Sequence, residues 1–116
     1  MTYQKSHIDT SGVLSRDAHK VIEALAPRTR WEIFEHVTRR AYSVGEIARL
    51  MPVSRPAVSQ HLKILKDVGL VQEEVDGVRH IFRADPRQLA VLRRWLDGFW
   101  DQALDNMKHL METQDD

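Results

Sequence analysis

Hydrogen-bonding and basic side chains gather in one short stretch, from Ser54 to Lys63, where they alternate with apolar residues. Val58, Leu62 and Leu65 recur at helical spacing, which predicts a buried stripe with a polar face opposite. Such polar groups can bond to the edges of DNA bases and neutralise phosphates. The alternative is an ordinary capped amphipathic helix with a polar outer face. The candidate DNA-binding residues are Ser54, Arg55, Pro56, Ser59, Gln60, His61 and Lys63, with Arg79 further along the chain.

Several helices are predicted to hold this stretch in place. A periodic apolar pattern predicts a first helix over 18–26, which stops before Pro27. Proline is favoured in the first turn of a helix, so Pro27 opens a second one. The apolar face of this second helix is expected to comprise Trp31, Ile33, Phe34 and Val37.

Capping signals bound the next two helices. Ser43 with Glu46 three residues later has the form of a capping box, and Pro52 ends the helix that follows. Ser54 caps a fourth helix, which Gly69 terminates. Two capped helices joined by a tight turn are typical of a helix-turn-helix, and the free N–H groups at the start of the second suit phosphate.

A β-hairpin is expected after the fourth helix. Strand-like runs over 70–75 and 78–84 flank Asp76-Gly77, and a two-residue Asp-Gly loop favours a type I′ turn. This pairing would set Val75 opposite Val78 and Glu74 opposite Arg79. The hairpin also carries Glu73 and Asp76, so we expect its attraction for phosphate to be weak. We therefore expect DNA affinity to come mainly from the fourth helix and from Arg28, Arg30, Arg39 and Arg40.

A long last helix is predicted from Asp85-Pro86 to about Thr113, roughly 42 Å at 1.5 Å per residue. It carries two apolar stripes, more than one small domain is expected to cover. A second copy of the chain is the simplest partner; the alternative is one wide face buried within a single subunit. The expected dimer contacts are Leu92, Leu96, Phe99, Trp100, Ala103 and Met107.

The order of elements and several motifs resemble the ArsR/SmtB family of bacterial regulators. Ser43-Val-Gly-Glu-Ile-Ala, Val58-Ser-Gln-His-Leu-Lys and Gly69-Leu70 carry the likeness, together with Ala24-Leu-Ala-Pro-Arg-Thr-Arg-Trp-Glu-Ile. The resemblance covers roughly residues 18–113. It implies a winged helix-turn-helix fold, mainly α with a β-hairpin wing. It also implies a homodimer built by the first and last helices, usually a repressor on an imperfect palindrome.

Metal sensing, which the family often performs, is not expected here. The chain has no cysteine, so thiolate sites are excluded. His109 and Glu112 match half of another site of the family, but Leu96 and Gly98 stand where its remaining ligands belong. A second stripe of Asp101, Asp105, His109 and Glu112 is more typical of a solvated helix face than of a divalent-cation site. We expect no metal and no cofactor.

Composition supports this interpretation. The 116 residues carry 17 basic and 17 acidic side chains. From 27 to 66 eight basic residues oppose three acidic ones, whereas from 95 to 116 one basic residue opposes six acidic ones. A basic middle and an acidic tail point to a polyanion as the partner of the middle. We expect a flexible arm over 1–15 and one domain over 16–113. No signal peptide or membrane span is apparent, which predicts a cytoplasmic location.

The sequence thus predicts a DNA-binding transcriptional regulator, acting as a homodimer on double-stranded operator DNA. No glycine-rich phosphate loop and no cysteine nucleophile are present, so an enzyme is not expected. The alternative is a winged-helix module that binds protein or only oligomerises, which the acidic hairpin and the net charge of zero would suit.

Overall fold

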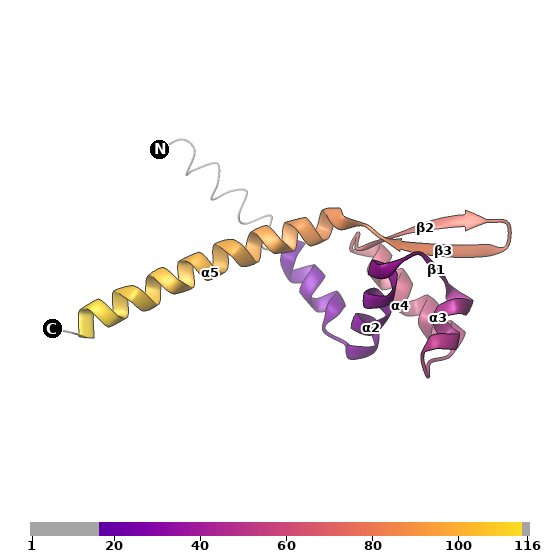
Figure 1. Ribbon diagram of the computed structural model, residues 1–116, viewed down its shortest axis with the longest axis horizontal. Coiled ribbons are helices and arrows are strands. Elements are labelled where there is room, and N and C mark those ends of the chain that lie inside the picture. Colours follow the sequence, from indigo (N-terminus) through magenta and orange to yellow (C-terminus); the bar gives the residue numbers. More distant parts are fainter. Residues whose placement is uncertain (1–16, 115–116) are drawn as a thin grey trace.

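A computed structural model describes residues 17–114 of the chain. Residues 17–25 are helical, followed by α2 (Arg28–Arg39), β1 (Tyr42–Ser43), α3 (Val44–Leu50) and α4 (Arg55–Asp67). The chain continues through β2 (Val71–Asp76), β3 (Arg79–Ala84) and α5 (Pro86–Gln114). In Figure 1 the helices before β2 form one bundle, the β2–β3 hairpin extends to one side, and α5 runs out on the other. The predicted arm over 1–15 lies outside the described residues.

The core is built where α2, α3 and α4 meet the base of the hairpin. Its fully buried side chains include the predicted α4 stripe, and α2 contributes the aliphatic and aromatic residues of its inner face. The sequence pattern places Trp31 on that face, but Trp31 is 46% exposed. Ile33, Phe34 and Val37 fill the inner arc of α2, and Trp31 lies outside it. The main contributors to the core are Val21 and Leu25 of the first helix, together with Ile33, Phe34, Val37, Ile47, Val58, Leu62, Leu65, Leu70, Val71 and Phe82.

Local hydrogen bonds fix both helices of the helix-turn-helix, as predicted. The capping box before α3 is complete: the Glu46 amide donates to Ser43 Oγ at 3.2 Å, and the Ser43 amide donates to Glu46 Oε1 at 2.8 Å. Ser54 Oγ accepts from the Ala57 amide at 3.3 Å. At the end of α4, Gly69 adopts φ +82°, and the Gly69 and Leu70 amides bond back to Lys66 and Leu65. This Schellman pattern turns the chain directly into β2.

The sheet has three strands in the order β1-β3-β2, all antiparallel. The sequence does not predict β1, because two residues carry no periodic signal. Its residue Tyr42 pairs with Phe82, so β1 ties the start of α3 to the base of the hairpin. The position of the wing relative to the helix-turn-helix is therefore set by backbone pairing.

The hairpin turn lies one residue later than predicted. Asp76 pairs with Arg79, so the loop is Gly77-Val78, and the expected pairings of Glu74 with Arg79 and of Val75 with Val78 are wrong. Gly77 has φ +64°, whereas no non-glycine residue in the described range has a positive φ. One positive φ at the first loop position is the pattern of a type II′ turn, in which glycine alone takes the left-handed conformation. A type I′ turn would also force Asp76 into it.

Asp85 joins the hairpin to α5. Its amide donates to the Leu70 carbonyl at 2.8 Å, and its carboxylate accepts from the Arg87 guanidinium at 2.6 Å and from Gln72 Nε2 at 2.9 Å. The Arg87 amide also donates to it, which caps α5. These bonds, led by that from the Arg87 side chain, hold the pKa of Asp85 far below its usual value of 3.8.

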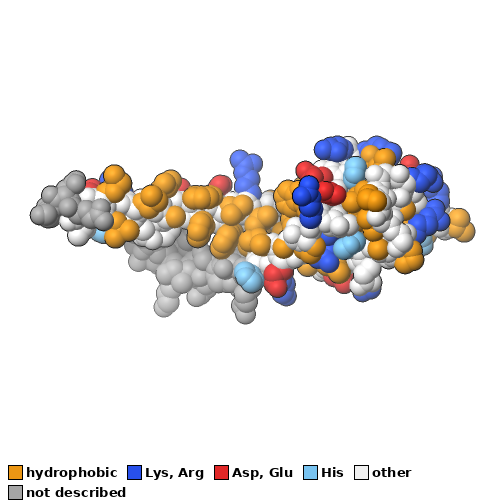
Figure 2. Space-filling model, turned by 90° about the horizontal axis from the view of Figure 1, so that it is seen from below, with side chains coloured by type: hydrophobic (Ala, Val, Ile, Leu, Met, Phe, Trp, Pro, Cys, Tyr) orange, Lys and Arg blue, Asp and Glu red, His pale blue; other side chains and the backbone are white. Residues whose placement is uncertain are grey.

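The long last helix is confirmed. α5 has 29 residues, or about 44 Å, and beyond its first turns it leaves the bundle (Figure 1). Figure 2 shows hydrophobic side chains running along this projecting part. Among residues 17–114, no helix is long and apolar enough to cross a bilayer. The mainly α architecture with a β-hairpin wing is the predicted winged helix-turn-helix.

Candidate nucleic-acid interface

The polar face of α4 is open to solvent, as the buried stripe requires. Val58, Leu62 and Leu65 are fully buried. At the start of the helix, Pro56 has no N–H, and the amides of Ala57 and Val58 donate to Ser54, so most of the expected free N–H groups are absent. Of the predicted site residues on this helix and its cap, the structure leaves these exposed: Ser54, Arg55, Pro56, Ser59, Gln60 and Lys63.

The structure separates His61 from this group. Its side chain is half-buried, and Nδ1 accepts a hydrogen bond from Arg30 Nε at 3.2 Å. The same guanidinium donates to the Ala24 carbonyl at 3.0 Å. Desolvation and then the charge of Arg30 lower the pKa of His61 below 6.5. His61 and Arg30 therefore join the first helix, α2 and α4, and Arg30 is not the free cation that the sequence suggested.

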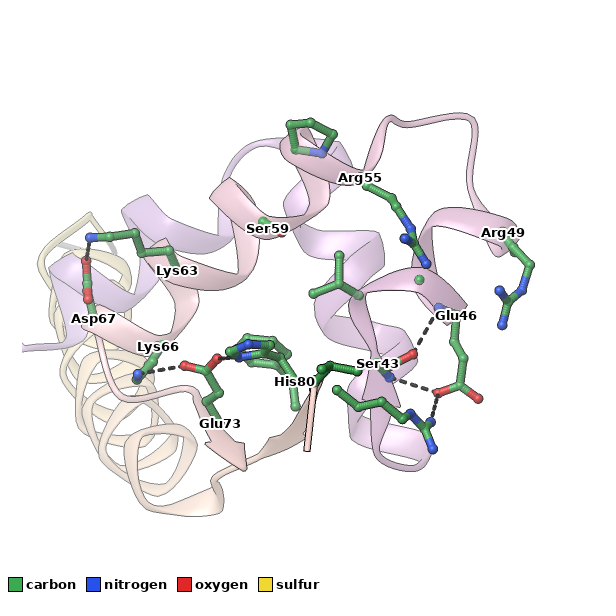
Figure 3. A pocket seen from close by; sticks show the side chains of 16 residues that line it. Ser43, Glu46, Arg49, Arg55, Ser59, Lys63, Lys66, Asp67, Glu73 and His80 are labelled. Atoms are coloured by element: carbon green, nitrogen blue, oxygen red, sulfur yellow. Dashed lines mark hydrogen bonds and ion pairs between the residues drawn. The ribbon is translucent and has the colours of Figure 1, made fainter. Parts of the chain in front are cut away.

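An open groove of about 1170 Å³ lies between the helix-turn-helix and the wing. Figure 3 shows side chains reaching into it from α3, from α4 and from the two hairpin strands. Arg79, the predicted wing residue, lines this groove together with Arg55, Ser59 and Lys63. With Pro56, which also lines the groove, the structure brings five predicted site residues to one concavity, although Arg79 lies on a different element from the other four. Its further polar lining is Ser43, Glu46, Arg49, Lys66, Asp67, Glu73 and His80.

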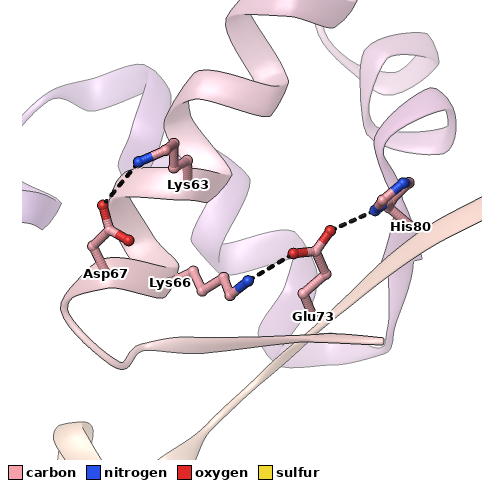
Figure 4. A network of polar contacts seen from close by, with 5 residues as sticks. All are labelled: Lys63, Lys66, Asp67, Glu73 and His80. Carbon is pink, nitrogen blue, oxygen red and sulfur yellow. Dashed lines mark hydrogen bonds and ion pairs between the residues drawn. The ribbon is translucent and has the colours of Figure 1, made fainter. Parts of the chain in front are cut away.

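Carboxylates within the groove engage most of its cations. Lys66 Nζ lies 2.8 Å from Glu73 Oε1, whose second oxygen lies 2.5 Å from His80 Nδ1 (Figure 4). The hydrogen bonds from Lys66 and then His80 hold the pKa of Glu73 below its usual value, and the contact with Glu73 raises the pKa of Lys66. Lys63 lies 3.4 Å from Asp67.

The carboxylate of Glu46, which also lines the groove, contacts two further cations. It lies 3.7 Å from Arg40 and 3.8 Å from Arg79, in addition to closing the capping box of α3. Its bond from the Ser43 amide is the main cause of its lowered pKa. Arg40 also stacks on the Tyr42 ring, 3.7 Å from its centre. Arg40 and Arg79 are thus attached to the protein rather than free.

Arg55 contacts a glycine and not a carboxylate. Its side chain crosses from the start of α4 to α3 (Figure 3). There its guanidinium lies over Gly45 so closely that a Cβ built on that glycine would overlap Nη2. No salt bridge involves Arg55 or its groove neighbour Arg49 within the range the structure describes. These two arginines are the groove cations whose charge is not locally compensated.

Sequence reasoning missed the residues that compensate the groove. Glu73 is recognisable in the sequence as an acidic wing residue, but its contact with Lys66 requires the chain reversal at Gly69 and was not foreseen. Glu46 is recognisable as a cap, and its bridge to Arg79 follows from the pairing of β1 with β3. The alternation of β2 is a usable signal, since it places Glu73 and Glu74 on opposite faces of the sheet.

Metal ligands do not converge in the described part of the chain. Among residues 17–114, no group of three or more His, Asp or Glu side chains is arranged to hold an ion. This range includes the stripe of Asp101, Asp105, His109 and Glu112 on α5, whose side chains are exposed.

Known proteins share this architecture. The model of the family described as "Bacterial regulatory protein, arsR family" matches residues 27–73. The HTH-type transcriptional regulator Rv2034 of Mycobacterium tuberculosis is 45% identical over 101 residues, covering 87% of this chain and 94% of that protein. The HTH-type transcriptional repressor SmtB of the same species is 36% identical over 73 residues, covering 63% and 54%.

Solved structures agree. An ArsR-like transcriptional regulator from Rhodococcus sp. RHA1 superposes with a TM-score of 0.70 at 32% identity, covering 83% of this chain and 93% of that one. The homodimeric winged helix-turn-helix DNA-binding domain Mb0332 of Mycobacterium bovis superposes with a TM-score of 0.64 at 25% identity, covering 84% and 91%. These relatives are transcriptional regulators and not enzymes. From its fold, its groove and these relatives, the chain belongs to the arsR family of bacterial transcriptional regulators.

Proposed function

We propose that the chain is a repressor that binds a palindromic operator as a homodimer, with α4 in the major groove. The observation that carries this proposal is the two-sided character of α4: three fully buried residues on one side and an uninterrupted exposed polar face on the other. A helix that merely completed a core would not need its exposed first turns to present arginine, serine and glutamine beside a groove rich in cations.

Each exposed side chain of α4 suits a particular contact. Gln60 can bond in a bidentate manner to adenine, Arg55 to guanine, and Ser59 to either base. Lys63 suits a phosphate. In this proposal Arg79 of the wing contributes little, because it already faces Glu46.

The proposed dimer uses the first helix and α5. The large apolar residues of α5 from Phe99 to Met111 are 50–65% exposed in the single chain, and Ile22 of the first helix is 40% exposed. A helix with this much apolar surface needs a partner, and the homodimeric relative from M. bovis makes a second copy the reasonable one. The proposed interface residues on α5 are Leu92, Leu96, Phe99, Trp100, Ala103 and Met107.

Charge along α5 favours an antiparallel arrangement. Its first half carries three arginines and one aspartate, whereas its second half carries three acidic residues and one lysine. If two copies overlap from end to end in opposite directions, the basic first half of each α5 lies beside the acidic second half of its partner. A parallel pair would set like charges against each other.

Repression is the outcome favoured by the SmtB relatives, which are named repressors. The cytoplasmic location remains part of the same proposal, because the operator lies there.

Selection of bound duplexes from a random pool tests DNA binding and identifies the operator sequence at the same time. We expect an enriched inverted repeat that the protein binds more tightly than a scrambled duplex in fluorescence anisotropy. The slope of log affinity against log salt should become shallower in Arg55→Ala and Lys63→Ala but not in Arg79→Ala. The reverse pattern would transfer the main contact to the wing. No enrichment, with no DNA retention at low salt, would instead favour a protein-interaction module.

A further inference from the structure

One carboxylate lies within the candidate DNA surface and contacts cations from two of its elements. Glu73 lies on β2, and its two oxygens contact Lys66 of α4 at 2.8 Å and His80 of β3 at 2.5 Å. Its side chain is only 20% exposed, and it lines the groove (Figures 3 and 4). A surface shaped only to attract a polyanion would not place a carboxylate at this point.

We propose that Glu73 limits the sequence-independent binding of DNA by this protein, by occupying Lys66 and His80 and by repelling phosphate itself. This inference rests on the proposed function. Sequence-independent affinity comes almost entirely from cations that replace the counterions of phosphates. A lysine held by a carboxylate 2.8 Å away must exchange one anion for another and so gains little from contact with DNA.

The biological reason lies in competition. A regulator must find its operator among a large excess of other sequences, so the ratio of specific to non-specific binding matters more than either affinity alone. Base-edge contacts by the α4 face do not depend on Glu73. A carboxylate within the groove therefore weakens the unwanted attraction and leaves the reading of bases to α4.

The neighbouring residue provides a matched control. Glu74 follows on the same strand, carries the same charge and also pairs with a cation, Arg83 at 3.1 Å. However, it lies on the opposite face of the sheet, with its side chain 62% exposed, and does not line the groove. Replacing either glutamate by glutamine changes the net charge equally, so any difference between the two variants reports position.

The experiment measures the affinity of the full chain for a scrambled duplex by anisotropy between about 50 and 300 mM salt. We expect Glu73→Gln to raise this affinity about tenfold near 100 mM and to steepen the salt slope by roughly one phosphate contact, about 0.9. Glu74→Gln should change the affinity less than about twofold. In the double variant Glu73→Gln/Lys66→Gln the slope should return toward that of the unmodified protein, because the released cation is gone.

The outcomes separate the two proposals. Equal gains from Glu73→Gln and Glu74→Gln would reduce the effect to net charge and overturn the role of Glu73. No gain or a loss in Glu73→Gln would also overturn it, since Glu73 would then be holding Lys66 and His80 in a binding position. In either case the proposed function stands as long as the unmodified protein enriches an operator. Failure of the unmodified protein to bind any duplex would instead refute the proposed function.

Discussion

The exposed apolar face of α5 gives a direct test of the dimer through Met107→Glu. Met107 is 58% exposed in the single chain and lies on the part of α5 that has left the bundle. The substitution therefore removes no contact from the core of its own subunit. We expect the monomer to fold normally and the dimer to dissociate.

The magnitude follows from burial and symmetry. Complete burial of a methionine side chain contributes about 1.5–3 kcal/mol, so covering the exposed part of Met107 contributes about 1 kcal/mol. A two-fold axis repeats each change, which gives about 2 kcal/mol, or roughly thirtyfold in Kd. Two carboxylates placed in an apolar interface raise the total to at least about 4 kcal/mol, or roughly a thousandfold.

Sedimentation velocity over a range of protein concentrations measures the dimer Kd, and circular dichroism checks the helix content. The control is His109→Glu, because His109 is exposed two residues further along and lies across the helix from the apolar face. We expect this variant to remain a dimer. A dimer of unchanged affinity in Met107→Glu, with His109→Glu behaving identically, would refute the assignment of this face.

Three further perturbations follow from local geometry. Folding lowers the pKa of His61, so near and below pH 6.5 the unfolded chain binds more protons than the folded one. The stability of the protein should therefore fall as the pH drops from 7.5 to 5.5, and it should fall less in His61→Gln. Thermal melts that respond equally to pH in both proteins would contradict this. Gly45→Ala should displace the guanidinium of Arg55 and weaken operator binding in the same direction as Arg55→Ala, with the double variant no weaker than the latter; additive losses in anisotropy would show that the contact does not matter. Gly77→Ala should destabilise the wing because its φ is +64°, whereas Gly98→Ala, in a helix with nothing within 4 Å, should stabilise the chain by roughly 0.5–1 kcal/mol; urea unfolding that shows the same sign for both would be inconsistent with this difference.

The sequence predicted best what short-range chemistry decides. Ser43 and Ser54 cap their helices and Gly69 ends α4 through bonds to residues at most five positions away. The α4 stripe follows in the same way from helical spacing. Because these features fix which face of α4 is buried, most of the candidate surface followed from sequence alone.

Features that depend on residues far apart in the chain could not be predicted from the sequence. β1 exists because Tyr42 pairs with Phe82, forty positions along the chain. His61 turns inward because Arg30, on another helix, donates to it. The prediction of the hairpin turn was wrong for a different reason. Gly77 is compatible with both a type I′ and a type II′ turn, so the Asp76-Gly77 dipeptide alone does not determine which of the two forms.

The bonds at Asp85 fix the start of α5 to the base of the wing, so α5 can tilt about this point as a rigid rod. Leu70, Gln72 and Arg87 all bond to this residue, so the end of α4, the start of β2 and the first turn of α5 are attached to one point. A rod of about 44 Å that tilts by about 5° about this point moves its far end by about 4 Å. Conversely, wherever a partner holds that far end, its position sets the angle at which α4 is presented, and the distance between two such helices is then governed by side chains that touch no DNA.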